Sequence, residues 1–151
     1  MASARPPRDK PEKAVKTQFS IKHLDHVVLR VSDMEQSIRF YSDALGCSVD
    51  RRREDLGMVH MRAGSSMIDL VDIRGPLGRA AGEAADLNRR NVDHFCLRVE
   101  PFDESALREH FQHFGFALEQ AVRRYGAEGE GPSVYCFDPD GNQVELKGAT
   151  S

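Results

Sequence analysis

The sequence has little of several features that mark particular classes of protein. It has three cysteines, Cys47, Cys96 and Cys136, without CxxC spacing, which argues against a disulfide framework or a zinc knot. It has no apolar run near the ~20 residues of a membrane span, and its amino terminus lacks the apolar core of a secretory signal. Its net charge is −3, so it has no excess of positive charge for nucleic acid or anionic membranes. We therefore expect a cytoplasmic protein that acts on a small molecule.

The length of 151 residues suits about one domain. Residues 1–20 contain three prolines and few large apolar side chains, so burial cannot offset the entropy of ordering them. We expect this segment to be a flexible N-terminal tail. The domain itself is predicted over 21–148, with a first module at 21–73, a linker at 74–90 and a second module at 91–148.

A repeated phrase organises the predicted domain. "LDHVVLRV" at 24–31 returns as "VDHFCLRV" at 92–99, with five of eight positions identical. A helix pattern follows each phrase: the first is predicted to begin with a capping box of Ser32 and Glu35 and to end at Gly46. Three short strand patterns come next in each half. The repeating unit is therefore a strand, a helix and three strands.

The strand and turn patterns carry further expectations. Pro and Gly in "DPDG" are typical of a type I turn, which predicts that the last two strands form a hairpin. The glycine-rich residues 126–132 are expected to form either an ordinary connection or a mobile lid. The predicted strands, in chain order, are 48–54, 58–63, 66–73, 116–124, 133–137 and 142–148.

Strand alternation predicts where the repeated histidines point, since side chains two apart share a face. In the first phrase the apolar side chains of Val27, Leu29 and Val31 share one face, which should pack under the helix. The opposite faces of the two modules then carry four potential metal ligands: His26, Asp69, His94 and Glu145. Imidazole and carboxylate suit a divalent ion such as Zn, Ni, Co, Mn or Fe. The alternative is that the histidines form hydrogen bonds within a half-buried sheet and the carboxylates are solvated.

The ordered segments "LDHVVLRVSDMEQSIRFYSDALGC", "MIDLVDI", "VDHFCLRV" and "VYCFDPDGNQVELKG" resemble the vicinal oxygen chelate superfamily. This superfamily includes glyoxalase I, extradiol dioxygenases, fosfomycin-resistance thiol transferases and metal-free bleomycin-resistance proteins. The resemblance implies an α+β fold of two tandem βαβββ modules that form a cupped eight-stranded mixed sheet with the helices outside. It also implies metal ligation by His26, His94 and Glu145.

The position of the fourth ligand of glyoxalase I falls on Asp69. The resemblance normally places glutamate there, and aspartate is one methylene shorter, so coordination through a water is an alternative to direct contact. Two other expectations concern this residue: it acts in catalysis together with Glu145, or it serves as a hydrogen-bond partner for a neighbouring arginine such as Arg30.

Three kinds of function remain open at this point. The first is a divalent-metal-dependent lyase or isomerase of the glyoxalase I type, acting on a small oxygen-chelating substrate such as a thiol adduct, with Glu145 and Asp69 transferring protons. The second is an extradiol-type dioxygenase or a thiol transferase on the three-ligand set, in which His60 is a candidate acid or base. The third is a metal-free drug-binding module. A homodimer is expected, and the site closes either within one chain or across two.

Overall fold

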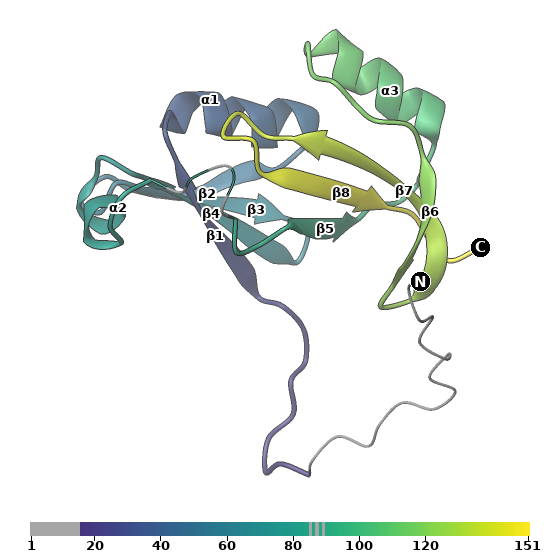
Figure 1. Cartoon of the computed structure of the whole chain (residues 1–151), viewed down its shortest axis with the longest axis horizontal. Coiled ribbons are helices and arrows are strands. Elements are labelled where there is room, and N and C mark those ends of the chain that lie inside the picture. The colour runs from purple at the N-terminus through teal and green to yellow at the C-terminus, as the bar shows by residue number, and fades with distance from the viewer. Residues whose placement is uncertain (1–15, 85, 87, 89) are drawn as a thin grey trace, which may run out of the picture.

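The computed structural model describes residues 16–84, 86, 88 and 90–151 of the chain. The tail expected over residues 1–20 therefore lies mostly outside the described residues. Within the described ranges, no helix has both the length and the apolar character needed to cross a membrane. Residues that precede the first strand extend away from the rest of the chain (Figure 1).

The first sheet is built from the first repeat. Its strand order is β1-β4-β3-β2, with β1 parallel to β4 and the other pairs antiparallel. Helix α1 lies between β1 and β2 in the chain and continues into a π-helical turn, η1. The elements are β1 (His26–Val31), α1 (Met34–Arg39), η1 (Phe40–Ala44), β2 (Ser48–Arg53), β3 (Met58–Ala63) and β4 (Ser66–Asp72).

The second sheet repeats this topology with the order β5-β8-β7-β6. Helices α1 and α3 lie on the same side of the two sheets (Figure 1). The predicted α+β fold of two βαβββ units is therefore confirmed, with the eight strands arranged as two four-stranded sheets. The elements are β5 (His94–Arg98), α3 (Glu104–His113), β6 (Val122–Gly126), β7 (Gly129–Phe137) and β8 (Gln143–Lys147).

Local details differ from the sequence prediction in four places. The first helix is capped by Asp33 and not Ser32, because the Asp33 carboxylate accepts a hydrogen bond from Gln36 N at 3.0 Å. The predicted linker contains a short helix, α2 (Pro76–Ala80). Residues 116–121, predicted as strand, precede β6, and Phe116 packs against the core instead. The glycine-rich loop belongs to the β6–β7 hairpin, since β7 begins at Gly129.

The core joins the two repeats beneath α1. The helix-facing side chains of β4 and β8 are buried in one cluster with those of α1 and η1, as strand alternation predicted. Phe40 packs edge-on against Phe116, with ring centroids 5.0 Å apart, so the first repeat contacts the second directly. Because both sheets contribute to the same apolar cluster, neither can move without exposing the other.

A buried carboxylate fixes the turn between β7 and β8 to α1. Asp138 accepts hydrogen bonds from Tyr41 Oη at 2.7 Å, from Asn142 N and Nδ2 at 2.8 Å, and from Asp140 N at 3.0 Å. Burial raises the pKa of Asp138, against the lowering effect of the donors on Asn142 and Tyr41. The expected β-turn is present, with Gly141 N donating to Asp138 O at 2.9 Å.

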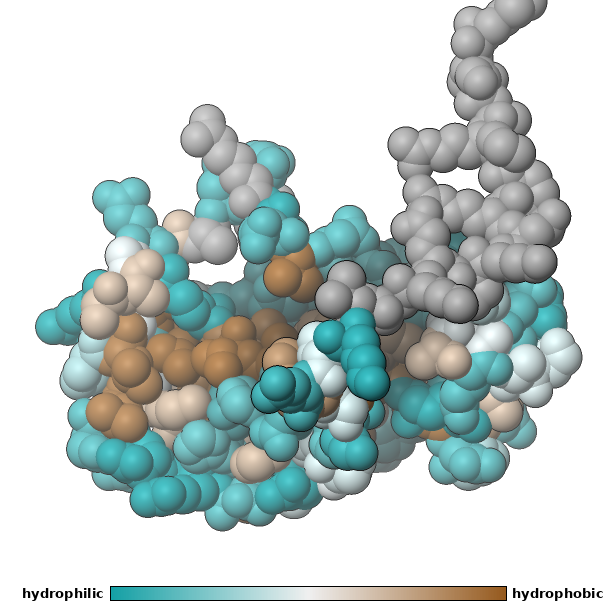
Figure 2. All heavy atoms as spheres, turned by 90° about the horizontal axis from the view of Figure 1, so that it is seen from below, coloured by the Kyte–Doolittle hydropathy of each residue, from teal (hydrophilic) through white to brown (hydrophobic). Residues whose placement is uncertain are grey.

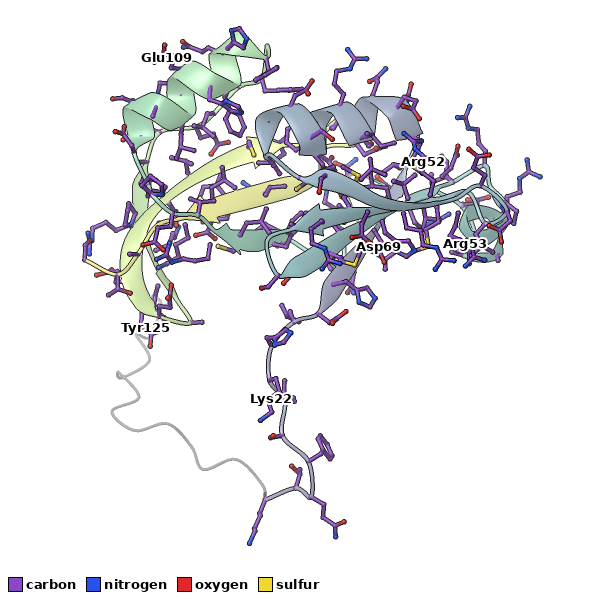
Figure 3. The ribbon with its side chains drawn as sticks, turned by 180° about the vertical axis from the view of Figure 1, so that it is seen from behind. Lys22, Arg52, Arg53, Asp69, Glu109 and Tyr125 are labelled. Carbon is purple, nitrogen blue, oxygen red and sulfur yellow. The ribbon has the colours of Figure 1, made fainter. Side chains whose placement is uncertain are left out.

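We expect Tyr41→Phe to lower the free energy of unfolding by about 1–3 kcal/mol, because the buried Asp138 carboxylate loses a donor that water cannot replace. Urea unfolding followed by circular dichroism measures this change. Tyr125→Phe is the matched control: Tyr125 is 85% exposed and projects from the end of β6 (Figure 3). Equal stability of the two variants would show that the Tyr41 hydroxyl contributes nothing to the fold.

Candidate functional site

The four predicted ligands lie on the faces of the sheets that point away from α1 and α3. In the first sheet, Asp69 alternates with the buried helix-facing Ile68 and Leu70 of β4 and is only 4% exposed. Figure 3 shows Asp69 at the sheet, below α1, whereas Glu109 lies on the outer helix α3. In the second sheet, Glu145 is 5% exposed and lies opposite Cys96 of β5.

The second sheet brings His94 and Glu145 together. The Nε2 atom of His94 lies 3.0 Å from Oε2 of Glu145. The other oxygen of Glu145 accepts a hydrogen bond of 2.5 Å from the Ser133 hydroxyl on β7. The ring of Tyr135 stands edge-on to that of His94, with centroids 5.6 Å apart. The imidazole and the carboxylate are therefore both held in place by neighbouring strands.

Each repeated histidine also contacts the aspartate that precedes it. His94 Nδ1 lies 2.6 Å from Asp93 Oδ2, and His26 Nδ1 lies 2.7 Å from Asp25 Oδ1. The hydrogen bond to Asp25 raises the pKa of His26 above its usual value, with a smaller contribution from the negative charge of Asp69. In both copies Nδ1 contacts the preceding aspartate, so any further ligand has to reach Nε2, which in His94 already lies beside Glu145.

Asp69 has a partner that the sequence did not assign to it. His60 Nδ1, on the adjacent strand β3, lies 2.8 Å from Asp69 Oδ1. The expectation of an Arg30 partner is wrong, because the Arg30 guanidinium donates to the backbone carbonyls of Gly78, Gly82 and Glu83 beside α2. Arg30 is thus bound to the linker, and His60 is the residue that contacts Asp69.

Within the part of the chain that is described, no group of three or more His, Cys, Asp or Glu side chains converges so as to hold a metal ion. The first sheet carries His26 near Asp69, and the second carries His94 with Glu145. Among those residues, neither pair receives a third ligand. Each sheet therefore presents half of the predicted set.

The surroundings of the two pairs differ. A cavity of ≈ 280 Å³ adjoins His94 and is lined also by Arg124, Tyr135 and Gln143; Arg124 Nε donates to the Tyr135 hydroxyl at 3.1 Å. Around Asp69, four neighbouring positions on the same face are apolar, and the position directly opposite on β3 is His60. Seen from the side opposite the helices, apolar side chains gather over the half of the molecule nearer α2 (Figure 2). The apolar residues on this face of the first sheet are Val28, Met58, Met67 and Val71.

A comparison with models of known protein families identifies the superfamily of the chain. The model of the Glyoxalase/Bleomycin resistance protein/Dioxygenase superfamily matches residues 23–146. The chain belongs to this superfamily. The match spans both repeats, from the residues before His26 to Leu146 at the end of the Glu145 strand.

Relatives within the superfamily share most of the chain. The virulence protein STM3117 of Salmonella typhimurium is 31% identical over 133 residues, which cover 85% of each chain. Its crystal structure has a TM-score of 0.70 at 27% identity and covers 87% of this chain and 100% of that one. The glyoxalase domain-containing protein RDO1 of Mycosarcoma maydis is 32% identical over 85% of this chain and 69% of its own.

A more distant superfamily structure supports the fold alone. The lactoylglutathione lyase of Agrobacterium tumefaciens has a TM-score of 0.61 at 24% identity, and the match covers 85% of this chain and 95% of that one.

Three residues of the site were not singled out from the sequence. Asp25 and Asp93 contact the histidines, and Ser133 contacts Glu145. The duplicated "DH" in the two phrases was a usable signal for the aspartates, because a carboxylate next to a ligating histidine orients its ring. Ser133 left no such signal, since its contact depends on the register of β7 against β8.

Cys96 lies on the same face as His94 and Glu145 but is a poor nucleophile. Burial raises its pKa to about 11; the negative charge of Glu145 adds to this effect and the positive charge of Lys147 opposes it. Because the thiolate is the reacting species, chemistry that starts from this thiol is disfavoured near neutral pH.

At pH 8 we expect iodoacetamide to alkylate Cys96 about a hundredfold more slowly than a free cysteine, because so little of it is thiolate. The rate should rise about tenfold per pH unit as the pH approaches the pKa. Mass spectrometry of the Cys96 peptide measures the rate, with the urea-unfolded protein as control. A rate equal to that of the unfolded protein at pH 8 contradicts the raised pKa.

Proposed function

We propose that the chain is a divalent-metal-dependent lyase or isomerase of the glyoxalase type, whose site is completed across a homodimer. His26 and Asp69 of one copy would face His94 and Glu145 of the other. The substrate would be a small molecule with two neighbouring oxygens that bind the metal, such as the adduct of a thiol with an oxoaldehyde. Membership of the superfamily and the chemistry of these four side chains support the proposal.

The main observation that supports the proposal is the contact between aspartate and histidine, which occurs in both repeats. In metal sites a ligating histidine almost always engages a carboxylate or carbonyl through its other ring nitrogen, which orients the ligand and raises its basicity. Here Asp25 and Asp93 engage Nδ1 of the two histidines in the same way. A histidine that only filled a sheet surface would not need the same partner in both copies. The arrangement therefore fits a metal bound through the two Nε2 atoms.

The division of ligands between the sheets supports a site shared by two chains. Zinc and the neighbouring transition metals take four to six ligands, and each sheet supplies one histidine and one carboxylate. Closed two-fold symmetry gives two identical composite sites from the same four side chains. Two such half-sites, facing each other across the dimer, would together provide four ligands, whereas each sheet alone provides two.

The protein side chains would control proton transfer in this site. When bound, a divalent metal supplies Lewis-acid polarisation of the substrate oxygens. Glu145 is positioned to accept a proton from substrate, since Ser133 holds one carboxylate oxygen and leaves the other beside His94. Asp69 would act from the facing sheet, either towards the metal or by orienting His60.

A second candidate is an extradiol-type dioxygenase on a three-ligand site of His26, His94 and Glu145. The contact between His60 and Asp69 favours it, because Asp69 is then engaged by an imidazole that can act as acid or base. Isomerisation of a hemithioacetal separates the first candidate from the second, for which catechol-dependent oxygen uptake with iron(II) is the matching assay.

Replacing Asp93 or Asp25 by asparagine should weaken metal binding by about 10–100-fold, because the histidine loses the carboxylate that orients it. Competition with a chromophoric chelator measures the affinity for zinc. Asp50→Asn is the control, since Asp50 lies on the edge strand β2 and pairs with the exposed Arg62 of β3. Unchanged affinity in both variants would leave the aspartates without a role at the metal.

A mixing experiment tests whether the site is shared. His26→Ala removes a ligand from the first sheet and Glu145→Ala removes one from the second, so each homodimer should lose tight metal binding and hemithioacetal isomerisation. Unfolding and refolding the two variants together should restore about one quarter of the parent activity and tight metal content, because half of the random dimers are mixed and each contains one intact site.

Two outcomes contradict this prediction. No recovery, with mixed dimers present, would mean that the site closes within one chain. Full metal content in either single variant would mean that the ligands are misassigned. A monomer by light scattering at micromolar concentration also removes the basis for a shared site.

A further inference from the structure

Lys147 is a buried cation on the ligand-bearing face of the second sheet. It is the last residue of β8, two positions after Glu145, so both side chains lie on the same face. Lys147 is only 5% exposed. Lysine is almost never buried to this extent unless its charge is paired.

The ammonium group of Lys147 has no partner among the described residues: it forms neither a hydrogen bond nor an ion pair there. The other cations of this face are engaged, since Arg98 pairs with Glu128 at 2.6 Å and Arg124 donates to the Tyr135 hydroxyl. In the described ranges, Arg30 Nε is the only unpartnered side-chain nitrogen or oxygen that is fully sealed from solvent. The Lys147 nitrogen therefore keeps a small opening to solvent.

This side chain lies close to two glycines. A Cβ atom at Gly126 of β6 would lie 3.1 Å from Lys147 Cε, and one at Gly131 of β7 would lie 3.1 Å from Nζ. The lysine stem thus runs across β7 towards β6, over positions that have no side chain. The Arg98–Glu128 ion pair spans the same strands, since Arg98 lies opposite Lys147 on β5 and Glu128 lies in the β6–β7 turn.

Burying an ammonium without a counterion costs stability. Packing does not require the charge here, because a methionine of similar length would fill the space above the glycines. The unpaired ammonium of Lys147 destabilises the free protein, and its nitrogen is accessible. It is therefore suited to bind a ligand that brings the missing negative charge.

We propose that Lys147 binds an oxyanion group of the substrate: a carboxylate, a phosphonate or a phosphate. As a description of the substrate, this rests on the proposed function: the molecule would carry two metal-binding oxygens and, separated from them, an anionic group. The Cα atoms of Glu145 and Lys147 are about 7 Å apart, two residues along one strand. The apolar side chains beside Asp69 on the first sheet would receive the uncharged remainder.

The first experiment uses the metal-free full-length protein and needs no substrate. Isothermal titration with acetate, methylphosphonate and inorganic phosphate identifies which oxyanion binds. We expect at least one to bind the parent and to bind Lys147→Met about tenfold more weakly or worse, the loss of one hydrogen bond to a charged group. Lys22→Met removes the same charge from the exposed arm before β1 (Figure 3) and should behave as the parent.

Three results overturn the proposal. The first is that none of the three anions binds, or that Lys147→Met binds them as well as the parent. The second is a loss of stability in urea, because removal of an unpaired buried charge should leave stability equal or higher. The third is a shift of Lys147→Met from dimer to monomer, which would mean that Lys147 pairs with a carboxylate of the second copy.

A second titration separates this inference from the proposed metal site. Acetohydroxamate and succinohydroxamate bind metal through the same two oxygens, and only the latter carries a carboxylate. On the zinc-loaded parent, succinohydroxamate should bind about tenfold more tightly, and on Lys147→Met the two should bind equally. A difference that persists in the variant overturns the role of Lys147. If acetohydroxamate fails to bind the zinc-treated parent, the metal site is refuted, and the metal-free titration still decides the anion site.

Discussion

The hydrogen bond from Tyr41 to the buried Asp138 carboxylate determines how the two repeats sit against each other. Tyr41 belongs to the helix of the first repeat, and Asp138 begins the turn that leads into the last strand of the second. Asp138 has no access to bulk water as a substitute donor, so the bond can be lost only at the cost of an unsatisfied charge. Because Glu145 lies on β8, seven residues after Asp138, its position relative to the first sheet depends on the same contact.

The faces of the sheets were predictable and their mutual placement was not. The alternation of side chains along a strand is a local property of the backbone, so His26, Asp69, His94 and Glu145 were assigned to the correct faces from the sequence alone. Which ligands meet depends on long-range packing, such as that of Phe40 on Phe116 across the repeats. No periodicity encodes such a contact. The error over residues 116–121 has the same origin, since core packing there overrides strand propensity.

The partners of the ligands illustrate a second limit of sequence patterns. The "DH" pairs were visible because duplication marked them, and the structure gives Asp25 and Asp93 the same contact in both halves. His60 became the partner of Asp69 because the two lie directly opposite each other in the register of β3 and β4. That register is set by the hairpin between the strands and by burial of alternate residues. Strand alternation places Arg30 and Asp69 on the same face, whereas the register selects His60 as the partner.

The two sheets share a topology and have diverged in what surrounds the ligands. In the first sheet, apolar side chains of β1, β3 and β4 lie beside the contact between Asp69 and His60, which suits an uncharged part of a ligand. In the second it carries arginine, tyrosine and a buried lysine that has no counterion among the described residues. A lysine retained at a cost to stability is hard to explain by folding, because an apolar side chain would pack there at least as well. If the two faces meet across a dimer, their differences become complementary: one wall excludes water from the ligand and the other supplies positive charge, so the asymmetry between the repeats is what would give a duplicated scaffold its selectivity.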